Sequence, residues 1–509
     1  MVLHTEQRPE CLADLIDRQA ADRASATLLE DARSDRAVSY DDLAVRARQW
    51  RAALADVPPA GRVLLDVADP IVFATAFLCI IAAGRCAVPV NPQAPHSELD
   101  RTVRAVAPVA VVGDRADRVA RLGLPPLPAE RSVSGTTLGT ERSISGTVLG
   151  AEPTGTDDAA MRGTGAALLL TSGSTGAPKA VELTEDRLLH VARCVAAHHR
   201  LSKSDRGFNP LPLFHINAEV VALLGSLCAG ATLVVDTRFR RNGFWELVAD
   251  RDVTWINAVP AILTILAGEP VPVLPPRLRF VRSASAPLPP AVKSRIGALT
   301  GVAVVESYGM TEAASQITAS PLSGASPAGS AGRPVGVELQ IRDAAGRVLP
   351  PGQAGTVWIR GAGVIGGYLG GRAADRFDFE GWLDTGDLGH LDADGFLFLA
   401  GRADDVINRG GELLYPREIE EILVGEPGVI DAAVVGRPDP VLGEVPVAFV
   451  LAAPGRADDE LVNRLHARCA EHLSRFKRPT DITAVAELPR AATGKIQRHR
   501  LREPEPAAR

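Results

Sequence analysis

The sequence predicts an α/β protein with a large layered α/β N-terminal domain and a small, mobile α+β C-terminal domain. Three observations support this fold class. The chain has 509 residues, more than one hydrophobic core usually supports. Helical and strand patterns alternate along the N-terminal part, which is typical of layered α/β domains. Glycine and acidic residues at 401–405 follow an apolar run, so we expect a hinge there and domains at residues 1–401 and 402–509.

The N-terminal alternation begins with a helical pattern. Large apolar residues and alanine recur at helical spacing within residues 39–56, which predicts an amphipathic helix. Residues 63–67 then predict a short buried strand. The apolar runs 71–83, 87–90 and 109–113 continue the alternation, so the pattern predicts a layered sheet with helices packed against it.

The C-terminal part has its own set of elements. Residues 418–424 and 458–473 predict helices, and residues 431–436 and 447–451 predict strands. These elements would form an α+β unit of about a hundred residues, which is large enough to be a separate domain.

A direct repeat separates two parts of the N-terminal domain. Glu130–Thr140 reads ERSVSGTTLGT, and Glu141–Ala151 reads ERSISGTVLGA. Two copies are too few for a stacked repeat fold. The Ser/Gly/Thr content predicts that the insert 130–151 is a flexible surface excursion, with a regulatory or partner-binding role as the alternative.

Composition excludes several classes of function. The net charge of −6 lacks the basic excess of a nucleic-acid-binding protein. The six cysteines contain no C-x-x-C pair, which predicts neither a zinc site nor a disulfide framework and fits a reducing compartment. The apolar run 71–84 is too short to cross a bilayer, and the N-terminus has no apolar leader. We therefore expect a cytoplasmic enzyme without an integral membrane segment.

The segment Thr171–Ala180 reads TSGSTGAPKA and suits a loop that wraps a polyphosphate. Gly173 and Gly176 permit backbone angles that let successive N–H groups converge on phosphate oxygens, and Lys179 supplies a counter-charge. An apolar run at 166–170 predicts a strand just before the loop. Further hydroxyl donors in the segment are Thr171, Ser172, Ser174 and Thr175.

This segment differs from a P-loop, because Pro178 precedes Lys179 and no hydroxyl residue follows the lysine. A solvent-exposed Ser/Gly linker is the alternative interpretation. The loop resembles the phosphate-binding signature of the adenylate-forming superfamily, which includes acyl-CoA synthetases, peptide-synthetase adenylation domains and luciferases. The resemblance continues in the same order through Tyr308–Glu312, Asp384–Asp387, Gly401–Glu420 and Pro489–Lys495.

The resemblance implies roles for residues that would bind MgATP. Tyr308 offers an aromatic face for adenine, Thr311 a hydroxyl for the α-phosphate, and Glu312 a hard oxygen ligand for Mg²⁺. Asp387 and Arg402 would hold the ribose hydroxyls. Lys495 would neutralise charge between the acid's carboxylate and the α-phosphate as the catalytic lysine, and adenine contacts are also implied for Ala286 and Pro287.

The resemblance also implies an acid-binding segment and a hinge. His215 and Asn217 open the acid-binding helix, with His215 as the gate of the pocket. Relatives that activate amino acids generally place an aspartate after the phenylalanine, where this chain has His215. Ser285 and Gly309 would line the acid pocket. The loop with Gly410 and Gly411 would serve the thioester step after rotation about Asp404.

Together these features imply an AMP-forming acyl-CoA synthetase that uses ATP, Mg²⁺ and coenzyme A. We expect an apolar, aromatic or bulky acid without an α-amino group, because His215 cannot hold an ammonium. The chain departs from the relatives at Ala284 and Ser285, which replace glycines of a G-G-A-P-L turn.

Other readings of the sequence remain open. One is a ligase for a small dicarboxylate of the oxalate or succinylbenzoate type. Others are an adenylation enzyme that loads a carrier protein, and a non-catalytic adenylate-binding regulator. A homodimer is also left open. The Ala/Arg/Gly-rich, lysine-poor composition hints at bacterial specialised metabolism.

Overall fold

The computed structural model describes residues 10–127, 163–171, 179–273, 275–322, 326–371, 373–410, 412–453, 455–456, 459–491 and 495–502. The chain forms two compact units that divide between Phe239 and Arg240, with residues 368–372 belonging to the first unit. The duplicated insert 130–151 lies outside the described residues. The domain boundary expected between residues 401 and 402 stays a prediction.

The first unit contains two sheets. In one, β9, β10 and β1 are parallel neighbours, and β2 pairs antiparallel with β1. The other has the order β6-β5-β3-β4-β7-β8, in which only the β7–β8 pair is antiparallel. The strands are β1 (Thr27–Asp31), β2 (Ala37–Ser39), β3 (Arg62–Asp66), β4 (Cys86–Pro89), β5 (Ala110–Gly113), β6 (Pro126–Leu127), β7 (Ala166–Thr171), β8 (Lys179–Thr184), β9 (Arg206–Asn209) and β10 (Thr232–Val235).

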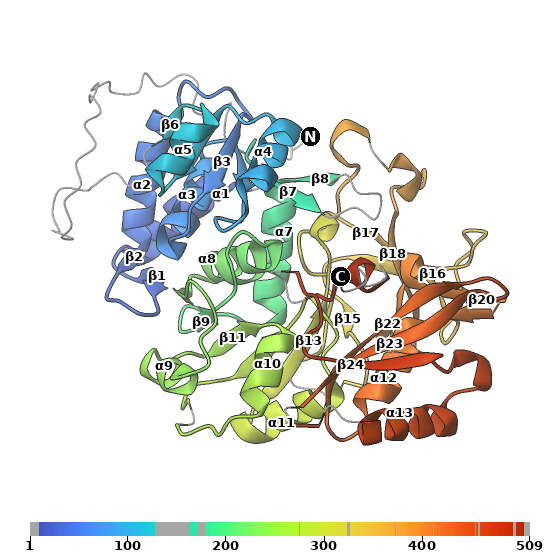
Figure 1. The fold of residues 1–509 in the computed structure, drawn as a ribbon. Helices are drawn as coiled ribbons and strands as arrows, with labels where there is room; N and C mark the ends of the chain where they lie inside the picture. The colour runs from blue at the N-terminus through green and yellow to red at the C-terminus, as the bar shows by residue number, and fades with distance from the viewer. Residues whose placement is uncertain are drawn as a thin grey trace, which may run out of the picture. The chain divides into compact units, whose positions relative to one another are not determined.

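Helices cover these sheets, as Figure 1 shows in blue to green. The most buried of them is α3, whose 13 residues are all buried because the helix is apolar on every side. Asp69 caps it by accepting the backbone N–H of Ile71 at 2.9 Å. The helices are α1 (Leu12–Arg23), α2 (Tyr40–Ala53), α3 (Pro70–Ala82), α4 (His96–Val106), α5 (Ala116–Leu122), α7 (Glu185–His198), the π-helix η1 (Asn217–Leu224), α8 (Gly225–Ala229) and the 3₁₀ turn η3 (Leu369–Gly371).

The second unit begins with three parallel strands, β11, β12 and β13, followed by the antiparallel pairs β13–β14 and β14–β15. A four-stranded antiparallel sheet, β16-β17-β18-β19, comes next in the chain. The elements of the second unit, up to the end of this sheet, are α9 (Phe244–Asp250), β11 (Trp255–Ala258), α10 (Pro260–Ala267), β12 (Phe280–Ser283), α11 (Pro290–Thr300), β13 (Ala303–Tyr308), η2 (Thr311–Ala313), β14 (Thr318–Ala319), β15 (Arg333–Pro334), β16 (Glu338–Arg342), β17 (Gly355–Arg360), η4 (Ala374–Arg376), β18 (Leu383–Leu391) and β19 (Leu397–Arg402).

The C-terminal part of this unit is the α+β arrangement that Figure 1 shows in orange and red. Its sheet has the order β21-β20-β23-β22, with β24 parallel to β23, and buried leucines such as Leu423 and Leu465 fill its core. The elements are η5 (Ala403–Asp405), β20 (Ile407–Arg409), β21 (Glu412–Leu414), α12 (Pro416–Val424), β22 (Val429–Asp439), β23 (Gly443–Ala452), α13 (Asp459–His472), η6 (Arg475–Lys477), β24 (Asp481–Val485) and α14 (His499–Arg502).

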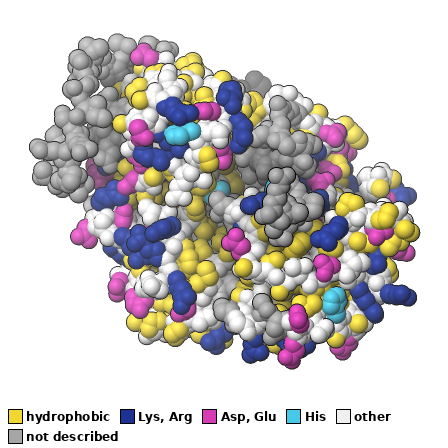
Figure 2. Space-filling model, in the orientation of Figure 1, with side chains coloured by type: hydrophobic (Ala, Val, Ile, Leu, Met, Phe, Trp, Pro, Cys, Tyr) yellow, Lys and Arg dark blue, Asp and Glu magenta, His cyan; other side chains and the backbone are white. Residues whose placement is uncertain are grey.

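The expected α/β fold class is confirmed by these elements. The helix predicted within residues 39–56 is α2, and the strand predicted at 63–67 is β3. The two helices and two strands predicted between residues 418 and 473 are α12, α13, β22 and β23. Within the described ranges, no helix combines the length and the apolarity that a membrane crossing needs. On the face in Figure 2, basic side chains lie interspersed among acidic and apolar ones.

Candidate functional site

A tyrosine, an aspartate and an arginine meet in the second unit. Tyr308 ends β13, while Asp387 and Arg402 are paired residues of the antiparallel strands β18 and β19. The Tyr308 hydroxyl donates to Asp387 Oδ2 at 2.5 Å, and Arg402 Nη1 lies 3.4 Å from Asp387 Oδ1. Strand pairing therefore places a carboxylate between a phenol and a guanidinium.

The electrostatics of this cluster make Asp387 an acceptor. Burial raises the pKa of Asp387, while the charge of Arg402 and the hydrogen bond from Tyr308 oppose the rise. Burial and the nearby Asp387 charge raise the pKa of Tyr308 well above its ordinary value, which keeps its hydroxyl protonated as a donor. A carboxylate held in this way has lone pairs suited to the hydroxyls of a sugar.

Lys495 lies within electrostatic reach of the same cluster. Its backbone carbonyl accepts the N–H of Ala491 at 2.8 Å. The side chain is exposed, and desolvation by the surrounding residues, followed by the charge of Arg402, lowers its pKa. The carboxylates of Asp387 and Asp405 act in the opposite direction. The structure thus brings the predicted lysine and the predicted ribose-binding pair into one charged group.

The turn after Tyr308 depends on a glycine. A Cβ atom added to Gly309 would lie 1.4 Å from the carbonyl oxygen of Ser315, so no side chain fits there. Thr311 begins the 3₁₀ turn η2, and Glu312, the predicted metal ligand, is buried with 7% of its surface exposed. Ser315 has a φ of +96°, a left-handed value that costs a non-glycine residue energy. The turn is therefore a tightly constrained segment.

Arg282 is a buried residue that sequence reasoning did not single out as a site residue. Its guanidinium donates to Asn257 Oδ1 at 3.0 Å, Ser307 Oγ at 2.9 Å and Gln316 Oε1 at 3.4 Å. Burial lowers its pKa to about 9. These bonds join β11, β12, β13 and the turn after Tyr308. The signal available in the sequence was a lone arginine between Val281 and Ser283, inside a short strand.

The segment that departs from the glycine-rich pattern keeps a glycine-like backbone. Ser285 has a φ of +77° and an exposed side chain. Ala284 before it is buried, whereas Ala286 is half-buried and Pro287 is exposed. The chain therefore adopts the turn that a glycine favours while carrying a serine side chain, at a cost in strain.

The predicted phosphate loop is described only at its two ends. Thr171 and Lys179 are paired residues of the antiparallel strands β7 and β8, so the loop joins two neighbouring strands. Lys179 Nζ lies 5.2 Å from the centre of the Tyr368 ring, in the same unit. The remaining predicted residues of the loop lie outside the described residues, namely Ser172, Gly173, Ser174, Thr175 and Gly176.

The predicted acid-binding segment begins a helix in the first unit. His215 precedes η1, and its carbonyl accepts the N–H of Ala218 at 2.9 Å and of Glu219 at 3.1 Å. The His215 ring lies 4.3 Å from the ring of Phe214. Burial lowers the pKa of His215 to about 4, so the imidazole is neutral at pH 7. Asn217 is buried at the first position of η1.

The predicted hinge and thioester loop lie in the second unit. Asp404 is in η5, where its carbonyl accepts a hydrogen bond from Arg502 at 3.4 Å. Gly410 has a φ of +62°, and its N–H donates to the Leu442 carbonyl at 2.7 Å. Gly411 lies outside the described residues. Gly410 is therefore held to the segment between β22 and β23.

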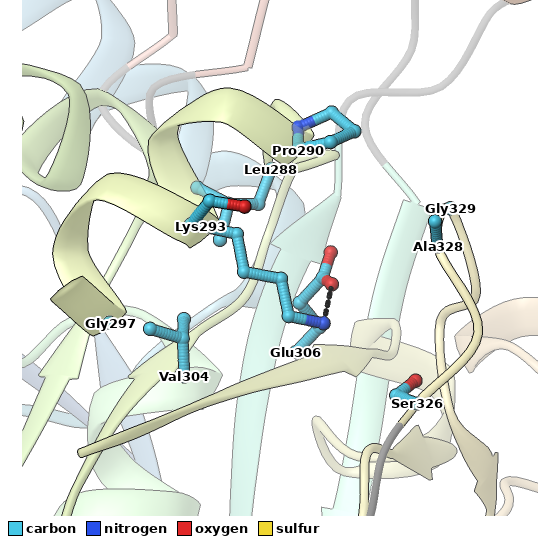
Figure 3. Close-up of a pocket in the computed structure, with 10 residues that line it drawn as sticks. Leu288, Pro290, Lys293, Gly297, Val304, Glu306, Ser326, Ala328 and Gly329 are labelled. Carbon is cyan, nitrogen blue, oxygen red and sulfur yellow. Dashed lines mark hydrogen bonds and ion pairs between the residues drawn. The ribbon is translucent and has the colours of Figure 1, made fainter. Parts of the chain in front are cut away.

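A separate pocket of about 370 Å³ lies in the second unit, between α11 and β13 (Figure 3). Lys293 Nζ and Glu306 Oε1 form an ion pair 2.7 Å apart within it, so the two charges compensate each other. The sequence-predicted residues are not among those lining this pocket.

Comparisons with known proteins give a consistent result. A family model described as AMP-binding enzyme matches residues 16–369, and one described as AMP-binding enzyme C-terminal domain matches residues 418–495. The sulfoacetate–CoA ligase of Cupriavidus necator is 41% identical over 339 residues, which are 66% of this chain and 66% of that protein. The oxalate–CoA ligase of Arabidopsis thaliana is 39% identical over 343 residues, again 66% of each chain. These matches thus span 66% of the relatives' length.

A solved structure extends the likeness to nearly the whole chain. The o-succinylbenzoate CoA synthetase of Bacillus subtilis, in complex with its acyl-adenylate intermediate, superposes with a TM-score of 0.81 at 25% identity. The match covers 96% of this chain and 98% of that one. The fold is therefore that of the acyl-CoA synthetase-like enzymes. The same enzyme is also known with ATP and a magnesium ion, with a TM-score of 0.79.

Proposed function

The chain belongs to the family of AMP-binding enzymes, and from that premise we propose that it is an AMP-forming acid–CoA ligase. The carboxylate of the acid attacks the α-phosphorus of MgATP, so that a C–O–P bond forms and pyrophosphate leaves. The thiolate of coenzyme A then attacks the acyl carbon, a thioester forms, and AMP leaves. The relatives named above are CoA ligases, which supports both steps.

One observation carries the proposal, namely the cluster of Tyr308, Asp387 and Arg402 with Lys495 in electrostatic reach. An acceptor for ribose hydroxyls beside a cation is what nucleotidyl transfer requires, because the reaction depends on positioning and charge neutralisation. The lowered pKa of Lys495 reflects the partly desolvated setting in which a fixed charge acts most strongly.

The other nucleotide contacts follow the same scheme. We assign the phosphates to the loop that starts at Thr171 and ends at Lys179, and adenine to Tyr308, Ala286 and Pro287. Glu312 would hold Mg²⁺ together with the phosphates of ATP, and Thr311 would donate its hydroxyl to the α-phosphate. The residues fit this ion, because Mg²⁺ commonly takes one or two carboxylates and completes its shell with phosphates and water.

The second step is assigned to the loop with Gly410 and Gly411. We propose that residues 402–509 rotate about Asp404, withdraw Lys495 and present this loop to the pantetheine of coenzyme A. The six free cysteines support a reducing compartment such as the cytoplasm. A role in bacterial specialised metabolism and a homodimer stay predictions.

The acid is proposed from His215 and from the relatives. The neutral His215 supports an apolar, aromatic or bulky acid without an α-amino group. A small dianionic acid is the second candidate, because the relatives act on sulfoacetate and oxalate. Transfer to a carrier protein in place of coenzyme A is the alternative for the second step.

A test separates the two steps. We expect Lys495→Ala to lower acid-dependent pyrophosphate release by about a hundredfold to a thousandfold, because it removes charge stabilisation in the first transition state. Thioester formation from a chemically prepared acyl-adenylate should change little in the same variant. Lys203→Ala, at an exposed position of the first unit, is the control. Unchanged pyrophosphate release in Lys495→Ala would contradict the proposed role of the lysine.

A further inference from the structure

Glu219 is a completely buried carboxyl group that none of the proposed steps uses. Its exposed surface is 0%, and neither carboxyl oxygen has a hydrogen-bond partner among the described residues. Burying a polar group without a partner destabilises the folded state. A ligand that pairs with this carboxyl group would remove that destabilisation.

The position of Glu219 points to the acid. The Glu219 N–H bonds to the His215 carbonyl at 3.1 Å, so the two residues are one helical turn apart and share a helix face. The Nε2 atom of His215 also lacks a partner among the described residues. Helix η1 is a π-helix, an irregularity that occurs frequently at functional sites. With His215 as the proposed gate of the acid pocket, Glu219 lies one helical turn deeper on the same side of that pocket.

Among the described residues, no cation pairs with Glu219, and burial raises its pKa well above the ordinary value. A second carboxylate on the acid would therefore meet no positive charge at this point. A hydroxyl or amino group would find an acceptor oxygen without a partner among the described residues, and an ammonium would favour the ionised form of Glu219 and pair with it.

We propose that Glu219 is a specificity-determining residue of the acid pocket, which selects acids whose far end donates a hydrogen bond through an amino or hydroxyl group. The inference rests on the proposed acid–CoA ligase function and refines its substrate class. The rest of the acid keeps the apolar character proposed above from the neutral His215. The preferred acid is thus apolar along its length and polar at its far end.

The test compares acids that differ only at the far end. Para-aminomethylbenzoate and para-hydroxymethylbenzoate are matched with para-ethylbenzoate, and aminocaproate is matched with heptanoate, while adipate supplies a far-end carboxylate. The ratio of kcat/KM for donor and methyl-ended acids is measured in the wild-type chain, Glu219→Leu and Glu219→Gln. Leu224→Met, a volume-conserving change on the same helix, is the control. Circular dichroism melting checks that each variant folds.

We expect the wild-type chain to favour donor-ended acids about tenfold or more, since one hydrogen bond to a buried partner is worth about 1.4 kcal/mol or more. Glu219→Leu should abolish or invert this preference, and Leu224→Met should keep it. Glu219→Gln should keep the preference for the hydroxyl and lose the preference for the ammonium, which separates the two kinds of donor.

Other outcomes overturn the inference. If kcat/KM is equal for donor-ended and methyl-ended acids, or if the preference survives in Glu219→Leu, the role of Glu219 is contradicted. The proposed ligase function is unaffected by either result. A preference for adipate that Glu219→Leu abolishes makes Glu219 a donor to an anion, contrary to the proposal. If no acid yields AMP, the proposed function fails. In that case the melting temperature is measured with each acid added. An increase that only donor-ended acids cause in the wild-type chain, and that is absent in Glu219→Leu, would still support the binding role of Glu219.

Discussion

The carboxyl groups of Asp387, in the proposed nucleotide-binding region, and of Glu219, on helix η1, differ in whether the protein itself pairs them. Both oxygens of Asp387 have protein partners, and Arg282 donates to three side chains. Glu219 has neither oxygen paired among the described residues, and the same is true of Nε2 of His215. We infer that the proposed nucleotide-binding region is organised before its ligand arrives, whereas the proposed acid-binding region leaves polar groups for the acid to pair.

The largest change in stability is expected at Gly309, in the proposed nucleotide-binding region. Gly309→Ala forces a Cβ atom to within 1.4 Å of the Ser315 carbonyl oxygen, so the turn that carries Thr311 and Glu312 must move. We expect a loss of about 3 kcal/mol in the free energy of unfolding, measured in urea, and loss of ATP binding. Gly367→Ala, where nothing lies within 4 Å, should change stability by less than about 0.5 kcal/mol. A stable, ATP-binding Gly309→Ala would show that the turn is not constrained.

The next effect concerns Arg282. Arg282→Met leaves Asn257, Ser307 and Gln316 without their buried donor, and we expect the free energy of unfolding to fall by about 2–3 kcal/mol. Arg295→Met, at an exposed position on α11, should have little effect. Equal stability of the two variants would remove the evidence for a preorganised region. Calorimetry should show weaker ATP binding in Arg282→Met than in Arg295→Met, because the turn after Tyr308 is anchored by this network.

A substitution of Glu219 is expected to increase stability instead of lowering it. Glu219→Leu should raise the free energy of unfolding by about 1–2 kcal/mol, because it removes an unpaired buried carboxyl group. The gain should grow with pH. Above pH 4.5 the unfolded chain releases the proton of Glu219, whereas the folded chain, with its raised pKa, keeps it, so wild-type stability falls as pH rises toward the folded pKa. Melting temperatures measured from about pH 5 to about pH 8 test this slope, and a pH-independent difference between the two proteins would contradict it.

The smallest change in stability is expected at Ser285. Ser285→Gly relieves the strain of a φ of +77° but adds freedom to the unfolded chain, so the net gain should be about 1 kcal/mol or less. Ser283→Gly, in strand β12, should instead lose stability. Thermal unfolding distinguishes the two variants, and a destabilised Ser285→Gly would show that the serine hydroxyl outweighs the strain.

Local patterns in the sequence predicted much of the fold. The spacing of Leu43, Ala47 and Trp50 predicted α2, because the periodicity of an amphipathic helix is visible within one window. Motif residues such as Tyr308 and Asp387 were also found in advance, and the structure brings them together. Their roles as ligand contacts stay predictions.

Other features could not be read from local patterns. The partners of Arg282 stand 25 and 34 residues away along the chain, and they become visible only when strands pair. Glu219 is a single acidic residue in an apolar run. Its lack of hydrogen-bond partners among the described residues depends on the packing around it, which the local sequence does not show. The π-helix η1 has no composition signal that distinguishes it from an α-helix.

The most direct test of the central claim is to identify the products made from MgATP and a panel of acids by mass spectrometry. The panel should include aliphatic, aromatic, donor-ended and dicarboxylic acids, each with and without coenzyme A. We expect acyl-adenylate and pyrophosphate without coenzyme A, and AMP with a CoA thioester when coenzyme A is present. Acid-dependent cleavage of ATP to ADP and phosphate, or acyl-adenylate that never passes to coenzyme A, would contradict this expectation.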